Sequence, residues 1–126
     1  MSITDIGREG EKLARTILKE KIKVDGIFQA DWIVRKDGRY YCVEVKHKDR
    51  FKAPPFDGHG LDVRQVNARM AFYMDTGIRC LFLVIDTDNT LLWQWLDVLE
   101  DGNKFTTKNG VRIYDIKGFK KLPDVV

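Results

Sequence analysis

The feature that most constrains the fold is residues 30–46, which read as two short strands joined by a tight turn. Asp37-Gly38 marks the turn, because Gly accepts positive φ and Asp tolerates left-handed backbone geometry. Side chains alternate between two faces along the second strand, and the hairpin brings the acid that opens the first strand to the same end. We therefore expect one rim of a small sheet to gather two acids and a lysine, a grouping that core packing does not need: Asp31, Glu44 and Lys46.

Length and composition indicate one folded domain over residues 1–126. Hydrophobic residues make up 44% of the chain, which argues against a disordered protein. No apolar run reaches transmembrane length and the first residues lack a signal-peptide pattern, so we expect no membrane partner and a cytoplasmic, intracellular location. Cys42 and Cys80 lack metal-finger or redox spacing and are expected to be buried small apolar residues.

The net charge of +3 is modest, but its distribution is uneven. Residues 35–52 carry seven Lys or Arg against three Asp or Glu, and residues 104–121 carry six against one. A basic region beside the acid–lysine hairpin is suited to attract phosphates. The alternative, from charge alone, is an ordinary solvated charged face.

Residues 4–22 have the apolar spacing of a helix with one apolar face. Glu11 falls at the margin of that face, where it is available to a functional site. The alternative is an exposed ion pair between Glu11 and Arg15, four residues further along the helix. A short strand is expected around residues 23–28, before the hairpin.

Residues 47–61 are predicted to form a long irregular loop that begins with basic residues. Loops of this length within a compact domain are usually functional or mobile, and the alternative is a surface excursion pinned by its apolar residues. A second helix is predicted over residues 63–76, with Asp62 as its N-cap and Gly77 at its end. Gln65 lies three residues after Asp62, a spacing that also fits a capping box.

Two further strands complete the predicted sheet. The continuous apolar run of residues 80–85 is typical of a central strand covered on both faces, and residues 91–96 follow it after a turn. Residues 96–100 either finish that strand or begin a short helix, and residues 110–116 read as a late strand. The order helix, strand pair, helix, strand pair indicates a mixed α/β domain.

The acid–lysine grouping is suited to metal-assisted chemistry on phosphates. Asp31 and Glu44 supply hard oxygen ligands of the kind that Mg²⁺ or Mn²⁺ prefers, and the backbone carbonyl of Val45 is a further candidate ligand. Lys46 would orient an attacking water or stabilise transition-state charge, and Glu11 would allow a second metal. The alternative is an exposed, salt-bridged strand face, because Glu-Val-Lys alone is a weak motif.

Taken together, these residues resemble the PD-(D/E)XK nuclease superfamily, and within it the compact nucleases similar to Holliday junction resolvases. The residues that carry the resemblance are Gly10-Glu11, Asp31 and Glu44-Val45-Lys46, and it covers roughly residues 4–96. It implies a restriction-endonuclease-like core, a central four-stranded mixed sheet flanked by helices in the order αβββαβ. Ala30 stands where this family often has proline, and the cysteine cluster of its iron–sulfur branches is absent from the sequence.

The resemblance also implies roles for individual residues. It implies that Mg²⁺ or Mn²⁺ is bound by Asp31 and Glu44 with help from Glu11, that Lys46 is catalytic, and that Gln65 is an auxiliary residue near the site. The expected activity is a metal-dependent deoxyribonuclease that hydrolyses phosphodiester bonds, with endonuclease action on branched or junction DNA as one candidate.

The expected partner is DNA, and a homodimer is a further candidate because paired cuts need two active sites. Residues expected to contact DNA are Lys48, Arg50, Lys52, His59 and Arg64. An origin in a virus or phage is one candidate. Two alternatives stay open: a catalytically inactive nucleic-acid-binding or assembly module on the same fold, and a small structural domain.

Overall fold

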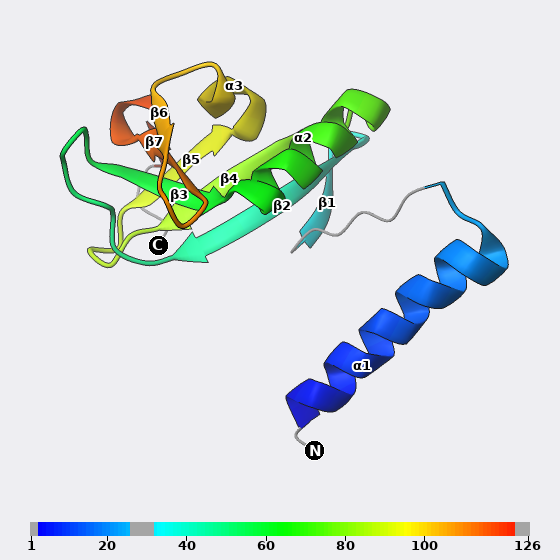
Figure 1. Cartoon of the computed structure of the whole chain (residues 1–126). Coiled ribbons are helices and arrows are strands. Elements are labelled where there is room, and N and C mark those ends of the chain that lie inside the picture. Colours follow the sequence, from blue (N-terminus) through cyan, green and yellow to red (C-terminus); the bar gives the residue numbers. More distant parts are fainter. Residues whose placement is uncertain (1–2, 26–31, 123–126) are drawn as a thin grey trace.

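The computed structural model describes residues 3–25 and 32–122, apart from the side chains of residues 3–8 and 11. Figure 1 shows the elements along the chain. They are α1 (Ile3–Thr16), the π-helix η1 (Ile17–Ile22), β1 (Trp32–Lys36), β2 (Arg39–His47), β3 (Gly58–Asp62), α2 (Val63–Thr76), β4 (Cys80–Ile85), β5 (Leu91–Trp95), α3 (Leu96–Glu100), β6 (Lys104–Thr106), β7 (Val111–Asp115), the 3₁₀-helix η2 (Ile116–Gly118) and β8 (Lys120–Lys121).

The central sheet is mixed and has the strand order β1-β2-β4-β5-β8. Strands β2 and β4 are parallel, and the other neighbouring pairs are antiparallel. The predicted hairpin is confirmed: β1 pairs with β2, and the turn between them has positive φ at Asp37 (52°) and Gly38 (78°). The four predicted strands of the core are therefore present, and the two-residue β8 adds a fifth that the sequence did not indicate.

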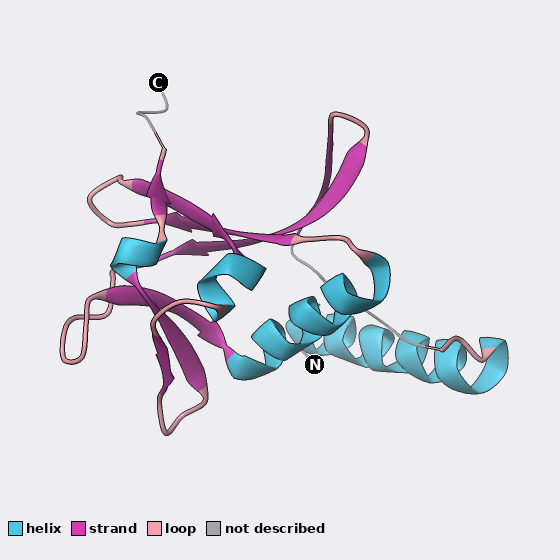
Figure 2. Ribbon diagram, turned by 90° about the horizontal axis from the view of Figure 1, so that it is seen from above, coloured by secondary structure: helices cyan, strands magenta, loops and turns pink. Residues whose placement is uncertain are grey.

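Helix α2 connects β3 to β4 and covers one face of the central sheet (Figure 2). The predicted bounds of this helix are confirmed, since Asp62 caps it by accepting from the Arg64 N–H at 2.8 Å and Gly77 ends it with φ of 77°. Beneath it lies the hydrophobic core, which α3 and the smaller sheet complete on the same side. Buried core residues include Cys42, Val66, Cys80, Phe82, Val84, Leu96, Leu99 and Tyr114.

The opposite face of the central sheet is also apolar, but its side chains are only half-buried. Tyr41 and Trp95 lie with ring centroids 5.1 Å apart on this face, and Trp93 packs edge-on against Trp95. They line a groove of about 470 Å³ together with Leu81, Leu83 and residues of the β1–β2 hairpin. Thus β4 is covered by helices on one face only, within the part of the chain that the structure describes.

A second sheet, with the order β3-β7-β6, replaces part of the predicted loop. The expectation of an irregular segment over residues 47–61 is wrong for His47, which ends β2, and for its last four residues, which belong to β3. The cause is tight pairing with β7: a Cβ built on Gly58 would lie 2.1 Å from the Tyr114 carbonyl oxygen. Gly58 and Gly60 are therefore required by close strand approach, a long-range contact that sequence spacing does not reveal.

The N-terminal helix differs from the prediction in two ways. The helical segment changes to the π-helix η1 at Ile17 and ends at Lys23, whose φ is 63°. In addition, α1 stands apart from the sheet (Figure 1), and the apolar side chains of Leu13 and Ile22 are exposed. Residues 23–25 form no strand, and the rest of the strand expected over 23–28 lies outside the described residues.

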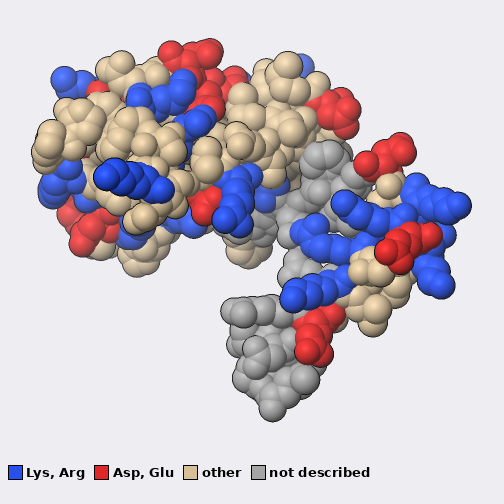
Figure 3. Space-filling view, viewed as in Figure 1, with Lys and Arg blue, Asp and Glu red and all other residues tan. Residues whose placement is uncertain are grey.

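The remaining sequence predictions concern the C-terminal half. Residues 96–100 form helix α3, which decides between the two alternatives for that segment, and the late strand is confirmed as β7. Lys and Arg side chains gather over α1 in one view, whereas over the sheet they alternate with acidic side chains (Figure 3). None of the helices within residues 3–25 and 32–122 has the length and apolar character needed to cross a membrane.

Candidate active site

Glu44 and Lys46 lie on the face of β2 that α2 covers. In the parallel pairing with β4, Glu44 is opposite Phe82 and Lys46 is opposite Val84, and both of these partners belong to the buried core. Glu44 is wholly buried, with 0% of its side chain exposed, while Lys46 is half-buried nearer the end of the strand. The alternation of β2 therefore directs an acid into the protein interior and a lysine towards its rim.

The Glu44 carboxylate is held by Arg69 of α2. The Arg69 Nε donates to Glu44 Oε1 at 2.5 Å, and the Arg69 side chain is itself only 7% exposed. Arg69 reaches the sheet because it lies three residues after the buried Val66, on the same face of the helix. Sequence reasoning missed Arg69, although its i+3 spacing from Val66 within the apolar stripe was a usable signal.

Two thiols share this buried environment. Cys42 and Cys80 are directly opposite each other on β2 and β4, and both are buried, as the sequence predicted. Burial, together with the nearby Glu44 carboxylate, raises the pKa of Cys80 to about 12. Burial also raises the pKa of the Cys42 thiol, although the Arg69 charge opposes that shift. The thiols are therefore neutral at physiological pH, and the charges in this part of the core are those of Glu44 and Arg69.

Gln65 and Arg64 lie in the first turn of α2. This helix leads back to the start of β4, which is parallel to β2, so its first turn lies towards the carboxyl end of β2, where Lys46 is found. Gln65 is half-buried and precedes Arg69 by four residues, so both side chains lie on the same side of the helix. Arg64 is exposed.

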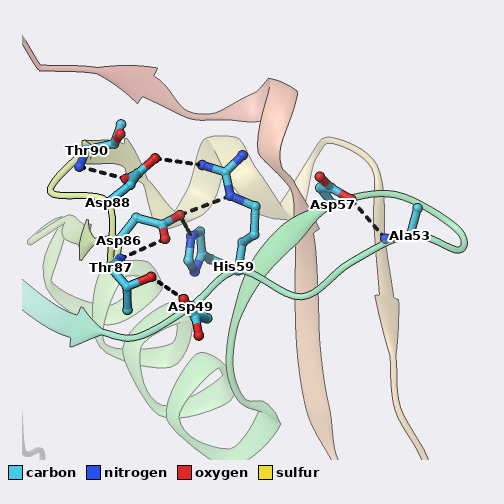
Figure 4. Close-up of polar contacts among 9 residues, drawn as sticks. Asp49, Ala53, Asp57, His59, Asp86, Thr87, Asp88 and Thr90 are labelled. Carbon is cyan, nitrogen blue, oxygen red and sulfur yellow. Dashed lines mark hydrogen bonds and ion pairs between the residues drawn. The ribbon is translucent and has the colours of Figure 1, made fainter.

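The basic segment after β2 is fixed by a buried carboxylate (Figure 4). Asp86, which follows β4, accepts hydrogen bonds at one oxygen from His59 Nε2 at 3.0 Å and from Arg50 Nε at 3.1 Å. Asp49 accepts a further hydrogen bond from the Thr87 hydroxyl. His59 is only 1% exposed, so the structure gives this residue an internal role and does not present it to a ligand at the surface. Lys48 and Lys52 are exposed on the same segment.

The pKa values of both His59 and Asp86 are lowered, for different reasons. Burial lowers the pKa of His59, and the hydrogen bond to Asp86 only partly offsets that effect. Burial acts to raise the pKa of Asp86, but hydrogen bonds from His59, Thr87 and Arg50 outweigh it and the net pKa is lowered. At neutral pH a carboxylate therefore binds a neutral imidazole and a guanidinium.

The structure describes only part of the predicted site. Asp31 lies outside the described residues, immediately before Trp32, which pairs with Val43. Glu11 lies on α1, which stands apart from β2, and its side chain is not described. Glu44, Lys46, Gln65 and Arg69 are the residues of the candidate site that the sheet and α2 do assemble.

The carboxylate of this site is the type of ligand that a divalent cation prefers. The Glu44 carboxylate is a hard oxygen donor of the type Mg²⁺ and Mn²⁺ prefer, and a guanidinium already balances its charge. Within residues 3–25 and 32–122, no group of three or more His, Cys, Asp or Glu side chains is positioned to hold a metal ion. A metal at Glu44 would therefore need further donors from Asp31, from Glu11 or from the backbone.

A solved structure similar to this one is that of Hjc, a Holliday junction resolvase from the archaeal hyperthermophile Archaeoglobus fulgidus. The two sequences are 16% identical, the match covers 84% of each chain, and the TM-score is 0.49. No protein-family model matches the sequence, and no curated protein matches it.

Proposed function

We propose that the chain is a metal-dependent nuclease that hydrolyses phosphodiester bonds in DNA. The observation that carries the proposal is the arrangement of Glu44 and Lys46 under α2, with the acid buried against a cation and the lysine nearer the rim. Ionised carboxylates are rarely buried in a fold unless they are paired or functional. Here the buried acid also belongs to the Glu-Val-Lys run that resembles the nuclease superfamily.

The proposed metal ligands are Asp31, Glu44, Glu11 and the backbone carbonyl of Val45. Mg²⁺ or Mn²⁺ bound there supplies an activated water and neutralises charge on the phosphate that is cleaved. Glu44 would be anchored by strand β2, and Asp31 directly precedes Trp32, the first residue of β1, in the sequence. For Glu11 to join them, α1 would have to lie against the sheet, from which it stands apart in this structure.

Lys46 is the proposed catalytic cation. Its ammonium group would hydrogen bond to the attacking water or to a non-bridging phosphate oxygen and stabilise the negative charge that develops in the transition state. Gln65, in the first turn of α2, would orient the same water through its side-chain amide. Both residues are half-buried, which limits the competing solvent around them.

The proposed DNA-binding surface is the basic segment beside the site. Lys48, Lys52 and Arg64 are exposed and free to approach phosphates, while Arg50 contributes charge and also ties the segment to Asp86. His59 would act from inside, by fixing this segment. Branched or junction DNA is the proposed substrate, and a homodimer is the proposed assembly for paired cuts in an intracellular setting.

The proposal is tested by incubating the protein with linear duplex, single-stranded, flap and four-way-junction DNA in the presence of Mg²⁺ or Mn²⁺. We expect metal-dependent cleavage that EDTA abolishes, with symmetric nicks if junctions are the substrate. Lys46→Ala should fold normally and lose cleavage. Lys108→Ala, at an exposed turn outside the site, is the matched control and should cleave normally.

The second candidate is a nucleic-acid-binding or assembly module without turnover. The observation that favours it is the Glu44–Arg69 ion pair, since a protein released from metal binding is free to fill the acid's coordination sphere with an arginine. This candidate predicts DNA binding without products for every substrate and metal in the same panel.

A further inference from the structure

The Arg69 guanidinium lies directly against the carboxylate of Glu44, which is one of the proposed metal ligands. The Glu44 side chain is 0% exposed and the Arg69 side chain, which comes from α2, is 7% exposed, so both charged groups are buried. The contact runs from Nε to Oε1 at 2.5 Å. A ligand approaching Glu44 from the side of α2 therefore meets a positive charge first.

This ion pair differs from the other arginine–carboxylate pairs of the described chain. Arg79 and Asp97 form a two-point contact that is partly exposed, with 32% and 21% of their side chains accessible to solvent. Arg69 is buried, and its NH1 group has no hydrogen-bond partner among the described residues. A buried ion pair adds stability only when its remaining protons are also satisfied, so Arg69 is poorly explained as a purely structural contact.

Building on the proposed function, we infer that Arg69 is a resident counter-ion that competes with the divalent cation for Glu44. In the metal-free protein the guanidinium neutralises the buried carboxylate. Metal binding at Glu44 requires Arg69 to withdraw, because a dication and a guanidinium within a few ångströms repel each other strongly in a poorly solvated site. Arg69 thus weakens metal binding and keeps the site closed until a divalent cation is abundant.

The inference is tested by measuring the affinity for Mn²⁺ alone, without DNA, from the loss of the free-ion electron paramagnetic resonance signal. Arg69→Gln should bind Mn²⁺ at least about tenfold more tightly than the unmodified protein, because the opposing charge is gone. Arg69→Lys keeps the charge and should stay within about threefold of the unmodified protein. Arg79→Gln removes an arginine from a surface ion pair and should leave the affinity unchanged.

If Arg69→Gln is unstable, the inference is tested by thermal unfolding with and without Mn²⁺, followed by circular dichroism. Mn²⁺ should raise the melting temperature of Arg69→Gln more than that of the unmodified protein, and should refold the variant if it is unfolded without metal, because the cation then replaces the guanidinium as the partner of Glu44. Arg79→Gln should show no extra response to Mn²⁺.

Three outcomes would overturn the inference. If Arg69→Gln and the unmodified protein bind Mn²⁺ with equal affinity, Arg69 does not compete with the metal, and the nuclease proposal is unaffected. Weaker binding by Arg69→Gln, or a variant that stays unfolded in saturating Mn²⁺, would show that Arg69 supports the site instead of opposing the metal. Absence of Mn²⁺ binding to both proteins would reject the proposed function together with the inference.

Discussion

Breaking the Glu44–Arg69 ion pair from one side should destabilise the fold far more than replacing both residues together. At the observed separation of 2.5 Å, the attraction is roughly 7 kcal/mol for an effective dielectric constant of about 20. Much of that energy offsets the cost of removing two charges from water. Arg69→Met leaves the carboxylate buried without its counter-ion, and we expect it to lower the free energy of unfolding by about 3–5 kcal/mol.

The double variant Glu44→Leu/Arg69→Met replaces both charges with apolar side chains, and we expect its free energy of unfolding to lie within about 1 kcal/mol of the unmodified protein. The assay is urea unfolding in EDTA, followed by the fluorescence of the three tryptophans. Glu44→Leu alone completes the double-mutant cycle. Strictly additive losses, with a coupling energy below about 0.5 kcal/mol, would refute the assignment of a coupled buried pair.

Two further predictions concern the segment that flanks the site. The pKa of His59 lies below its ordinary value of 6.5 in the folded state, so the unfolded chain takes up the proton first as pH falls below 6.5. The free energy of unfolding should therefore drop by up to about 1.4 kcal/mol per pH unit as the pH falls. His59→Gln should flatten this dependence when urea unfolding is compared at pH 7 and pH 5.5. Gly58→Ala should lower the free energy of unfolding by about 1–3 kcal/mol, because the new Cβ would lie 2.1 Å from a β7 carbonyl oxygen. At Gly102 the nearest atom to a new Cβ is 3.6 Å away, so Gly102→Ala should change the free energy of unfolding by less than about 0.5 kcal/mol. Similar melting temperatures for the two variants would contradict the close pairing of β3 with β7.

Local signals in the sequence were sufficient to predict the strands of much of the central sheet. The hairpin was predicted from the Asp37-Gly38 turn and from the alternation of side chains along the second strand. The prediction is confirmed because a two-residue turn fixes the register of the strands that it joins. Helix α2 was predicted with its bounds because Asp62 and Gly77 act on backbone groups within a few residues. The grouping of Glu44 with Lys46 on one face followed from strand geometry alone.

What the sequence did not reveal depends on contacts between distant segments. Arg69 is a charged residue on a helix, and only its packing against β2 turns it into the partner of Glu44. Likewise, His59 between two glycines resembled a functional loop, but β7 and Asp86 make it part of a buried strand. The position of α1 relative to the sheet is also a tertiary matter, because amphipathic spacing identifies an apolar face without saying what covers it.

The most direct test of the proposed chemistry is the single-turnover rate of junction DNA cleavage in Mn²⁺ by Lys46→Ala, compared with Lys108→Ala. We expect the first variant to be slower by about 10²–10³-fold, since one positioned electrostatic group typically contributes that much, and the second to match the unmodified protein. Cleavage by Lys46→Ala at the unmodified rate, with both variants folded, would show that the strand bearing Glu44 and Lys46 is not where DNA is cut.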